Sequence, residues 1–373
     1  MKICFLGDAT AYHLSRWSNY FSKKGYKVSV ITLNPEIIDG FDGVKVYLLK
    51  KKIDKSDLIS RILNLAPTLI KLKKIIKEIK PDIIHTHSVS PYGYLGALAK
   101  FYPFIITPWG NDVLIDVKES KIEKIFTKLS LKKADLITCD GENTEESLIN
   151  LGVFPEKIKF ITFGVDIKKF KSASDEEKKN LKKKYFSPDS NIIISTRTLN
   201  SIHNVDTFIK AIPFVIEKIS NAKFLIAGNG TEEKKLINLA RSLEIYNSIK
   251  FLGKLEEKEM ISALLASDIY VSTSLSESGL AASTAEAMAC GLPVINTDTG
   301  DIKLWLEKEG GFIIPVENPV VLAKKIIYLL QNSEIREKAR KVNRKVIEER
   351  NNYYKEMGKM EEIYKKLVDS YAK

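Results

Sequence analysis

Two carboxylates, Glu277 and Glu286, flank a run of small residues that contains Gly279, Ala281 and Ala282. The run follows an apolar stretch and leads into a helical pattern, so its backbone N–H groups would lie at the start of a helix. Such groups, together with the helix dipole, bind phosphate. Carboxylates beside a phosphate are favourable only where they bind hydroxyl groups, such as those of a sugar. The pattern predicts a site for a phosphorylated, hydroxyl-rich ligand; the alternative is an ordinary helix start with an acidic first turn.

Two more candidates in this half directly follow β-branched runs. Arg197 comes after Ile192–Thr196, where an arginine is suited to binding a diphosphate but also to a surface salt bridge. Gly228 and Gly230 come after Phe224–Ala227 and form a partial glycine fingerprint. The third glycine of that fingerprint is missing, and no acidic ribose-binding residue ends the next strand. We therefore exclude a nicotinamide dinucleotide site here.

The first half has its own candidates at the ends of predicted strands. The first strand runs into a small-residue loop, Gly7 to His13, that lacks a dinucleotide fingerprint. His85 and His87 end the fourth strand, and their spacing places both on one face of it. We expect no metal site, because neither a third histidine nor a carboxylate cluster accompanies them.

Alternating strands and helices must position these residues. The expected strands are apolar without clean alternation, as buried parallel strands are, and ligands of such sheets bind beyond the carboxyl ends of the strands. Helical periodicity marks Thr68–Lys80, Lys121–Lys133 and Asn352–Tyr371. The expected strands are Lys2–Leu6, Lys27–Thr32, Val44–Leu48, Asp82–Thr86, Phe104–Thr107, Leu136–Cys139, Phe160–Phe163, Ile192–Thr196, Phe224–Ala227, Lys250–Leu252, Ile269–Thr273, Val294–Thr297 and Phe312–Pro315.

The two halves repeat this alternation around a charged segment, 168–190, which we interpret as a linker with a short polar helix. The fold class is therefore α/β, with two Rossmann-like doubly wound domains that face each other across a cleft. We expect an N-terminal domain at 1–168, a linker at 169–190 and a C-terminal domain at 191–351. The terminal helix, 352–373, is expected to pack back on the first domain.

Composition excludes several classes of protein. A chain of 373 residues with 44% hydrophobic residues is expected to form two globular domains, and none of its apolar runs is long enough to span a bilayer. Its three cysteines are widely spaced, which argues against a disulfide framework. The net charge of +12 calls for an anionic partner. A nucleic acid is disfavoured, because the sequence has no nucleic-acid-binding motif.

The C-terminal half resembles the retaining family-four (group 1) glycosyltransferases of the GT-B fold, and the resemblance extends over nearly the whole chain. An acidic residue followed by a string such as Glu286–Val294 is quite specific to this family. The residues that carry the resemblance are Arg197, Gly228-Asn229-Gly230, Phe251-Leu252-Gly253-Lys254, Glu277 and the string Glu286-Ala287-Met288-Ala289-Cys290-Gly291-Leu292-Pro293-Val294.

The resemblance implies an enzyme that moves a hexosyl or N-acetylhexosaminyl group from a UDP- or GDP-linked donor to a hydroxyl of a glycan or lipid-linked acceptor. It implies retention of configuration. We expect no metal if Arg197 and backbone dipoles stabilise the departing phosphate, and no other cofactor. Arg197 and Glu277 would be catalytic. Acceptor-binding residues would be His13, His87, Trp109 and Asp112. Donor-binding residues would be Gly7, Arg197, Gly228, Gly230, Lys254, Glu277, Ser278, Gly279, Leu280, Ala281, Ala282 and Glu286.

The resemblance also assigns roles within the donor site. Glu286 would bind the ribose hydroxyls and Glu277 the hydroxyls of the donor sugar. The amides of Gly279–Ala282, together with Arg197, would hold the diphosphate and stabilise it as a leaving group. Lys254 would lie near the base.

Two features of the donor motif depart from the family pattern. Eight residues separate Glu277 from Glu286, one more than in the family. Either the turn holds an extra residue, or Ser278 takes the position of the first glutamate. The lysine that usually follows the arginine is also missing, and His203 is a weak substitute for it. Arg197 must then supply more of the positive charge.

Trp109 stands where many family members have the histidine of a His-Gly-x-Asp motif. An indole cannot act as a general base, so Trp109 is interpreted as stacking on a sugar or lining the cleft. Asp112 of this motif is retained. It is interpreted as an acceptor contact, with a loop cap as the alternative.

Alternatives to a transferase are a nucleotide-sugar epimerase of the same fold and, in another class, a basic nucleic-acid-binding protein. Lys51–Lys80 contains nine basic and three acidic residues. This amphipathic segment could rest on an acidic membrane that carries a lipid-linked acceptor, or could be an ordinary solvated helix face. We expect a cytoplasmic protein, with peripheral binding to the inner face of the cell membrane as an option.

Overall fold

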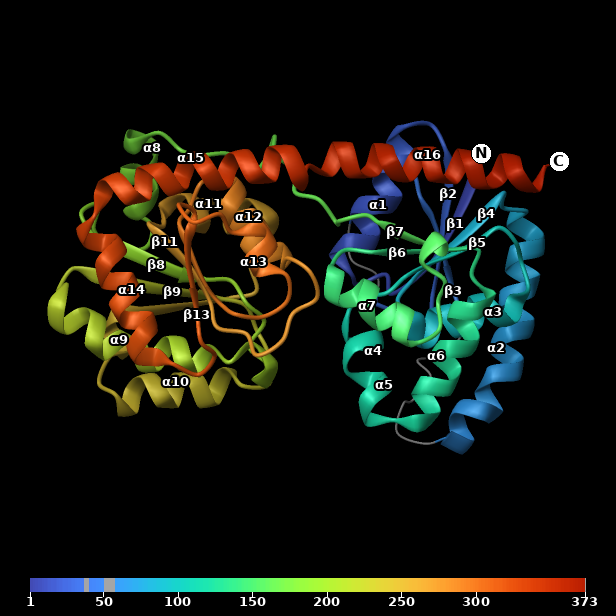
Figure 1. The fold of residues 1–373 in the computed structure, drawn as a ribbon, viewed down its shortest axis with the longest axis horizontal. Coiled ribbons are helices and arrows are strands. Elements are labelled where there is room, and N and C mark those ends of the chain that lie inside the picture. The colour runs from blue at the N-terminus through green and yellow to red at the C-terminus, as the bar shows by residue number, and fades with distance from the viewer. Residues whose placement is uncertain (37–39, 50–57, 373) are drawn as a thin grey trace. The chain divides into compact units, whose positions relative to one another are not determined.

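The computed structural model describes residues 1–36, 40–49 and 58–372, with the side chains of 58–64 excepted. The chain forms two compact units, each a Rossmann-like α/β domain built on a parallel sheet (Figure 1). Unit 1 comprises Met1–Phe163 and Lys355–Lys373, and unit 2 comprises Gly164–Tyr354. Within the described residues, no helix has the combined length and apolarity that crossing a bilayer requires.

Unit 1 contains a parallel sheet in the strand order β3-β2-β1-β4-β5-β6-β7. The strands are β1 (Lys2–Leu6), β2 (Lys27–Thr32), β3 (Lys45–Leu48), β4 (Ile83–His87), β5 (Phe104–Thr107), β6 (Leu136–Cys139) and β7 (Ile158–Phe160). The helices are α1 (Tyr12–Lys23), α2 (Leu58–Ile79), α3 (Tyr94–Ala99), α4 (Asn111–Leu114), α5 (Asp116–Glu119), α6 (Lys121–Lys133), α7 (Glu142–Asn150) and α16 (Tyr353–Tyr371), which begins at the end of unit 2.

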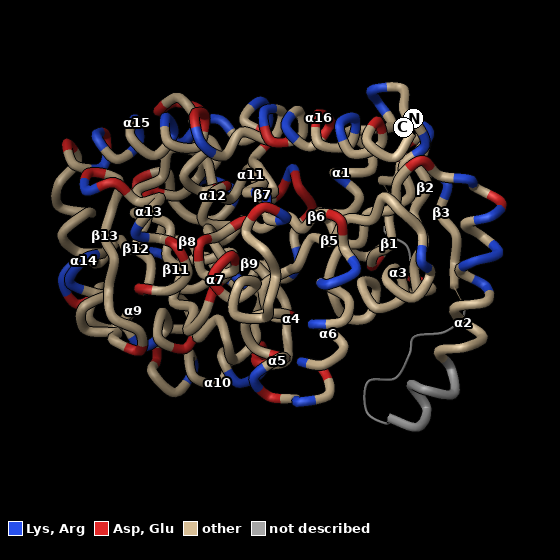
Figure 2. Tube along the Cα trace, turned by 45° about the vertical axis from the view of Figure 1, so that its right-hand side comes forward, with Lys and Arg blue, Asp and Glu red and all other residues tan. Residues whose placement is uncertain are grey.

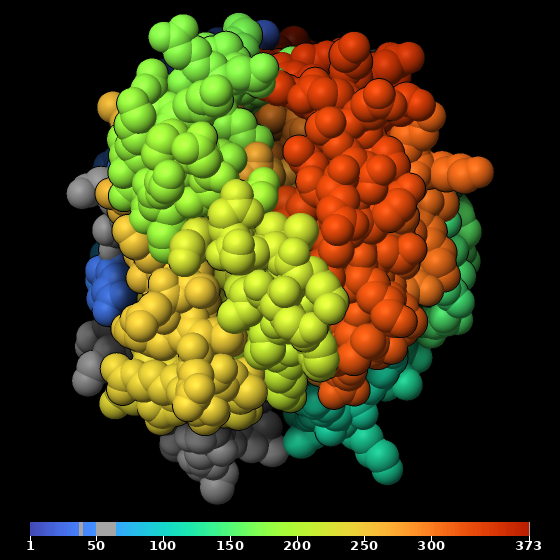
Figure 3. Space-filling model, turned by 90° about the vertical axis from the view of Figure 1, so that its left-hand side faces the viewer, coloured from blue at the N-terminus to red at the C-terminus, as the bar shows by residue number. Residues whose placement is uncertain are grey.

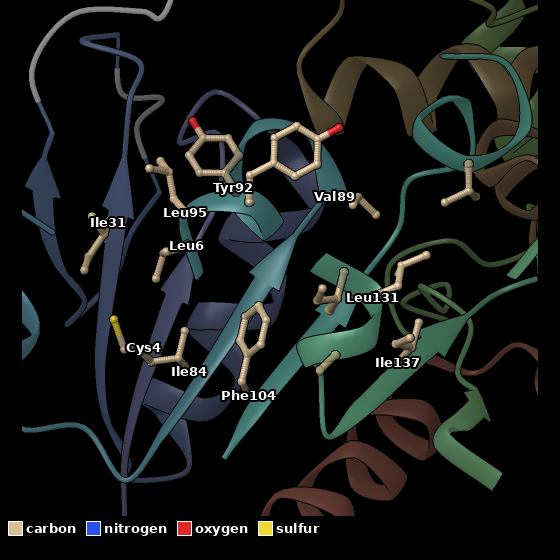
Figure 4. Packing of buried hydrophobic residues seen from close by; sticks show 14 of the residues in the cluster. Cys4, Leu6, Ile31, Ile84, Val89, Tyr92, Leu95, Phe104, Leu131 and Ile137 are labelled. Carbon is tan, nitrogen blue, oxygen red and sulfur yellow. The ribbon is translucent and has the colours of Figure 1, made fainter. Parts of the chain in front are cut away.

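Each face of the unit 1 sheet packs against its own set of helices, because alternate strand residues point to opposite faces. On one face the buried strand residues meet Leu95 of α3 and Leu131 of α6 (Figure 4). On the other face lie α1 and α16, whose Phe21 and Tyr364 rings are 5.0 Å apart. The strand residues of the first face include Cys4, Leu6, Ile31, Ile84, Phe104 and Ile137.

A chain of buried hydrogen bonds fastens α16 to the sheet. The Tyr364 hydroxyl lies 2.5 Å from Nδ1 of His85, and Nε2 of His85 lies 2.6 Å from Oγ1 of Thr107. Oγ1 of Thr107 is 2.5 Å from Oγ1 of Thr138. Burial lowers the pKa of His85, so the ring is neutral and accepts at one nitrogen while it donates at the other. The terminal helix is thereby joined to three adjacent strands of unit 1.

Removing the Tyr364 hydroxyl tests the contribution of this chain. Tyr364→Phe leaves a ring nitrogen of His85 buried without a partner, and should lower the free energy of unfolding by about 1–3 kcal/mol. Tyr371→Phe is the control: it removes an exposed hydroxyl from the same helix, and should change that free energy by less than about 0.5 kcal/mol. Urea unfolding followed by circular dichroism measures both. Equal losses in the two variants would contradict the proposed contribution.

Unit 2 contains a parallel sheet in the order β10-β9-β8-β11-β12-β13. Helices α9 and α14 pack side by side over one face of it (Figure 3). The strands are β8 (Asn191–Ser195), β9 (Ala222–Ala227), β10 (Ile249–Gly253), β11 (Ile269–Ser272), β12 (Val294–Thr297) and β13 (Gly311–Ile314). The helices are α8 (Asp175–Lys182), α9 (Val205–Lys218), α10 (Glu233–Ser242), α11 (Glu257–Ala266), α12 (Ala282–Ala289), α13 (Ile302–Trp305), α14 (Pro319–Gln331) and α15 (Ser333–Arg350).

The segment 169–190, which the sequence analysis assigns to a linker, lies within unit 2. It contains the expected short polar helix as α8, whose Ser174 cap accepts from the Glu177 N–H at 3.2 Å. Lys182 at the end of α8 is buried and donates to Asp268 at 2.8 Å and to the Ser190 carbonyl at 2.7 Å. A buried ion pair of this kind is costly to break, so α8 is an integral part of the unit.

One predicted strand, Phe160–Phe163, is misplaced, because β7 ends at Phe160. The apolar character of the segment is real, since Ile161 and Thr162 are buried. They are buried in an irregular stretch, however, where the Thr162 N–H donates to the carboxylate of Glu356 in α16 at 3.1 Å. Apolar composition therefore marked a buried segment but not its backbone conformation.

Candidate functional site

The order of the unit 2 strands changes direction between β8 and β11, and ligands of open parallel sheets bind at such a switch point. Arg197 lies in the loop that follows β8, and Glu277 in the loop that follows β11. Because both strands end at the same edge of the sheet, the two side chains meet there. Sequence reasoning placed both residues at strand ends, and the structure brings them into contact.

The Arg197 guanidinium is only 9% exposed and is held by three partners. Nη1 donates to Oγ of Ser283 at 2.8 Å, and Nη2 donates to Nδ1 of His203 at 3.0 Å. Nη2 also forms a charge-assisted hydrogen bond to the carboxylate of Glu277. Such bonds are strong and directional, so the guanidinium is oriented before any ligand arrives. The Nε–H is buried and has no hydrogen-bond partner in the described structure.

His203 lies beside Arg197 but does not supply the positive charge of the missing family lysine. Burial, and then the neighbouring Arg197 charge, lower the pKa of His203 to about 3, so the ring is neutral at physiological pH. Its Nδ1 is also 3.2 Å from Oγ of Ser274. His203 therefore orients the guanidinium, and Arg197 carries the positive charge of this cluster.

Helix α12 begins beside the guanidinium. Ser283 in its first turn accepts from Arg197 and also from the Tyr270 hydroxyl at 2.9 Å. The residue at the N-cap position is Ala281, and no side chain caps the first amides of the helix. An uncapped helix start next to an arginine is suited to an anion. The Gly279 carbonyl accepts from the Asp301 N–H at 3.0 Å, which ties the preceding turn to the loop after β12.

The remaining residues of the predicted donor motif surround this helix start. Ser278, Leu280 and Ala282 are half-buried in the turn, and Glu286 is half-buried one turn further along α12. Lys254 is exposed after β10, two strands away from β8, or about 10 Å by the usual strand spacing. Among the described residues, no hydrogen bond or ion pair joins Lys254 to the Arg197 cluster.

The glycines after β9 have a packing role that the fingerprint did not indicate. A Cβ on Gly228 would lie 2.4 Å from the Arg197 carbonyl oxygen, and one on Gly230 would lie 2.3 Å from that of Leu199. Gly228 also has a φ of +133°, which residues other than glycine rarely adopt. These glycines let the loop after β9 lie directly against the loop that carries Arg197.

Gly228→Ala should therefore damage both the fold and the site. We expect a loss of about 3 kcal/mol in the free energy of unfolding, from backbone overlap and positive φ, and weaker binding of the diphosphate ligand that the sequence predicts, as Arg197 shifts. Gly253→Ala is the matched control, because Gly253 also has positive φ, +64°, but no atom within 4 Å of an added Cβ. It should cost about 1 kcal/mol. Urea unfolding and calorimetric titration measure both effects, and similar results for the two variants would contradict the packing role.

The corresponding switch point in unit 1 lies between β1 and β4, where Gly7 and His87 are neighbours. A Cβ on Gly7 would lie 3.3 Å from Cβ of His87 and 2.9 Å from Cδ2 of Leu14. His87 is fully buried, and neither of its ring nitrogens has a hydrogen-bond partner in the described structure. His13 stacks on Phe163 at 4.4 Å. Burial lowers the pKa of both histidines to about 3, so they are neutral.

Trp109 and Asp112 follow β5 at the same edge of the sheet. The Trp109 ring lies edge-on to His87, with centroids 6.2 Å apart. Asp112 is buried and accepts from the N–H groups of Val89 at 2.7 Å and of Trp109 at 3.0 Å. Burial raises its pKa to about 6. Asp112 thus forms the loop cap that the sequence analysis gave as the alternative, and its contact with an acceptor stays a prediction.

Sequence reasoning missed several residues of the site. Arg197 or its partners are contacted by Ser274, Ser283 and Tyr270. Serines are common in loops, and a tyrosine within a strand is ordinarily interpreted as a core residue, so the sequence carried no signal for them. His203 was named only as a weak substitute for a lysine. Among the described residues, no group of three or more His, Cys, Asp or Glu side chains is arranged to hold a metal ion.

Comparisons with known proteins agree with this geometry. The family model described as glycosyl transferases group 1 matches residues 176–346, and the model described as glycosyl transferase 4-like matches residues 2–141. The chain is 27% identical to a GDP-mannose-dependent monoacylated alpha-(1-6)-phosphatidylinositol monomannoside mannosyltransferase of Corynebacterium glutamicum, over 70% of each chain. It is 29% identical to the UDP-Gal:alpha-D-GlcNAc-diphosphoundecaprenol alpha-1,3-galactosyltransferase of Escherichia coli, over 67% of each chain.

Solved structures show the same fold. Sucrose-phosphate synthase from Thermosynechococcus elongatus superposes with a TM-score of 0.86 at 17% identity, over 99% of this chain and 100% of that one. The Anabaena protein HepE in complex with UDP-glucose superposes with a TM-score of 0.83 at 19% identity, over 98% of this chain and 100% of that one. The chain therefore belongs to the group 1 glycosyltransferases of the GT-B fold.

Proposed function

We propose that the enzyme transfers a hexosyl or N-acetylhexosaminyl group from a UDP- or GDP-linked donor to a hydroxyl of a glycan or lipid-linked acceptor, with retention of configuration. One observation supports the proposal above all others. A buried, pre-oriented Arg197 lies beside the uncapped start of α12 at the switch point of the unit 2 sheet. A diphosphate leaving group gains negative charge as the sugar departs, and such a site stabilises that charge.

The relatives are consistent with this donor and acceptor chemistry. The Corynebacterium glutamicum relative is named as GDP-mannose-dependent and acts on a phosphatidylinositol mannoside. The Escherichia coli relative is named for UDP-Gal and a diphosphoundecaprenol-linked acceptor. Both names describe transfer to an acceptor rather than epimerisation. The choice between UDP and GDP is left to experiment, because the two relatives differ in it.

Within the donor site, binding of the diphosphate rearranges the contacts of Arg197. In the structure the Glu277 carboxylate is bonded to one amino group of the guanidinium. A diphosphate would compete for the same N–H groups, which would release the Glu277 carboxylate toward the hydroxyls of the sugar. The first amides of α12 would bind the distal phosphate, and Glu286 on the same helix would bind the ribose. Lys254 would contact the base from its position beyond β10.

In unit 1, we propose that the acceptor binds at the carboxyl ends of β1, β4 and β5. His87 has two unbonded ring nitrogens, and His13 and Trp109 each have one. An acceptor rich in hydroxyl groups would satisfy such atoms once side chains rearrange. Burial lowers the pKa of His13 and His87 to about 3, which makes both histidines weak bases, and Trp109 is not a base. The proton of the acceptor hydroxyl is therefore assigned to the departing phosphate. This is front-side attack, which retains configuration.

Donor profiling tests the proposed function. Release of UDP or GDP is measured over a panel of nucleotide sugars, with and without glycan and lipid-linked acceptors. Strong release with one donor, increased by an acceptor and accompanied by a glycosylated product, is the expected result. Conversion of the donor into an epimer without an acceptor would instead identify an epimerase. Full transfer activity in both Arg197→Ala and Glu286→Ala would show that the donor site is assigned wrongly.

A further inference from the structure

Helix α6 of unit 1 turns most of its apolar stripe to solvent. The sequence pattern places Ile122, Ile125, Phe126 and Leu129 on one face, which would ordinarily pack on the sheet. In the structure Ile122 is 41% exposed, Ile125 58% and Leu129 56%. The buried residues of α6 are Thr127, Ser130 and Leu131. A stripe of three large aliphatic side chains on one exposed helix face marks an interaction surface rather than isolated surface residues.

Every exposed residue of α6 is either aliphatic or a lysine. The one carboxylate of the helix, Glu123, is turned inward and accepts from the Tyr94 hydroxyl at 2.6 Å. At 100° per residue, the lysine row runs beside the aliphatic stripe along the helix. We call this surface the α6 outer face; its members are Lys121, Ile122, Lys124, Ile125, Lys128, Leu129, Lys132 and Lys133 (basic positions in Figure 2).

The lysines of the α6 outer face are exposed to solvent. Within the part of the chain that the structure describes, Lys121, Lys124, Lys128, Lys132 and Lys133 form no ion pair. By contrast, lysines on other helices pair at helical spacing, as Lys210 does with Asp206 at 2.6 Å and Lys365 with Glu361 at 2.8 Å. An unpaired row of positive charge beside an aliphatic stripe fits an anionic partner with an apolar interior.

We propose that the α6 outer face docks on a membrane surface that contains anionic lipids. The aliphatic stripe would enter the boundary between headgroups and acyl chains, and the lysines would meet the anionic headgroups. A second copy of the chain is a poorer partner, because two such faces would place their lysine rows against each other. The sequence analysis sought a membrane contact in Lys51–Lys80, of which 51–57 lie outside the described residues.

Neighbouring helices of the same layer extend the surface. Helix α3 packs between α2 and α6 and contributes Leu98, which is 38% exposed. Ile70 of α2 is 70% exposed and is followed by the exposed Lys71 and Lys74. The docking surface thus covers the outer side of three helices rather than one. The docking proposal rests on the proposed function in one respect only: the purpose of docking is to bring unit 1 to a lipid-linked acceptor.

Vesicle flotation with the full chain tests the docking. The wild type should float with vesicles of equimolar phosphatidylcholine and phosphatidylglycerol, and should stay in solution with phosphatidylcholine alone. The double variant Ile125→Asp/Leu129→Asp should lose bound fraction at least about tenfold. The quadruple variant of Lys121, Lys124, Lys128 and Lys132 to Gln should lose it to a similar extent, because headgroup attraction is removed.

Matched controls separate docking from net charge and from folding. A quadruple Gln variant of exposed lysines in unit 2, at Lys234, Lys324, Lys338 and Lys341, should bind vesicles almost as the wild type does. All variants should keep nucleoside diphosphate binding in thermal-shift titrations with UDP and GDP. That readout also separates this inference from the proposed function, since either can fail while the other holds.

Three results would overturn the docking proposal. The first is a wild type that does not float with vesicles containing phosphatidylglycerol. The second is undiminished flotation of the two α6 variants. The third is a wild type that is dimeric by light scattering and becomes monomeric on Ile125→Asp/Leu129→Asp, which would assign the face to a second copy of the chain.

Discussion

Replacing Arg197 with methionine should lower kcat/KM for sugar transfer by about 10²–10³-fold, the size of effect that follows removal of one preorganised donor to developing negative charge. Methionine keeps much of the apolar stem and removes the fork of N–H groups that Ser283, His203 and Glu277 hold in place. His203 cannot compensate, because it is neutral. Steady-state kinetics with the donor identified by profiling gives the measurement.

The conservative variant Arg197→Lys sharpens this prediction. It keeps the charge but lacks the planar fork of N–H groups that holds Ser283 and His203 in fixed directions, so its loss should lie between those of the wild type and Arg197→Met. Arg241→Met is the control, because Arg241 is exposed on α10 and its guanidinium lies over the Tyr246 ring at 5.1 Å. It should change kcat/KM by less than about twofold. If Arg197→Lys is as active as the wild type, the fork geometry has no catalytic role.

The fold was largely predictable, because the sequences of buried parallel strands are short apolar runs. Lys2–Leu6, Phe104–Thr107 and Val294–Thr297 have the bounds that the sequence predicted. What periodicity could not provide is the partner of an apolar stripe. In α6 the stripe was visible in the sequence, but the residues that the helix buries are Leu131 and the small polar residues Thr127 and Ser130. The apolar stripe therefore predicted the helix correctly, but not which of its residues are buried.

The candidate site was predictable only in part, and the reason is sequence distance. Arg197 and Glu277 could be found because each follows a strand. Their connecting network could not, because Ser283 lies 86 residues from Arg197 and nothing local links the two. The sequence also pointed to the glycines after β9, but it did not reveal why Gly228 is required there. Their spacing suggests a phosphate loop, whereas Gly228 is required by its close approach to the Arg197 carbonyl.

The spacing of the donor motif left open whether Glu277 or Ser278 occupies the first-glutamate position, and the contacts of Glu277 make this testable. Glu277 is bonded to Arg197, with side-chain exposures of 12% and 9% for the two residues. Glu277→Gln keeps the size of the side chain and removes its charge. Breaking this mostly buried pair should lower the free energy of unfolding of the ligand-free enzyme by about 2–3 kcal/mol.

The effects of Glu277→Gln on binding and on transfer should have opposite directions. UDP or GDP alone should bind at least as tightly as in the wild type, because the carboxylate that competes for Arg197 has gone. Transfer should nonetheless fall by about 10²-fold, because the charged contact with the sugar hydroxyls is lost where transition-state charge develops. Calorimetric titration of the nucleotide and single-turnover kinetics separate the two quantities.

Ser278→Ala provides the opposite arm of the comparison. If Glu277 is the functional glutamate and the turn simply holds one more residue, Ser278→Ala should change transfer by less than about threefold, as a half-buried hydroxyl outside the site would. The reverse pattern, with a severe loss in Ser278→Ala and a mild one in Glu277→Gln, would place Ser278 against the sugar. Glu277 would then be a positioning residue that holds Arg197 until the diphosphate takes its place.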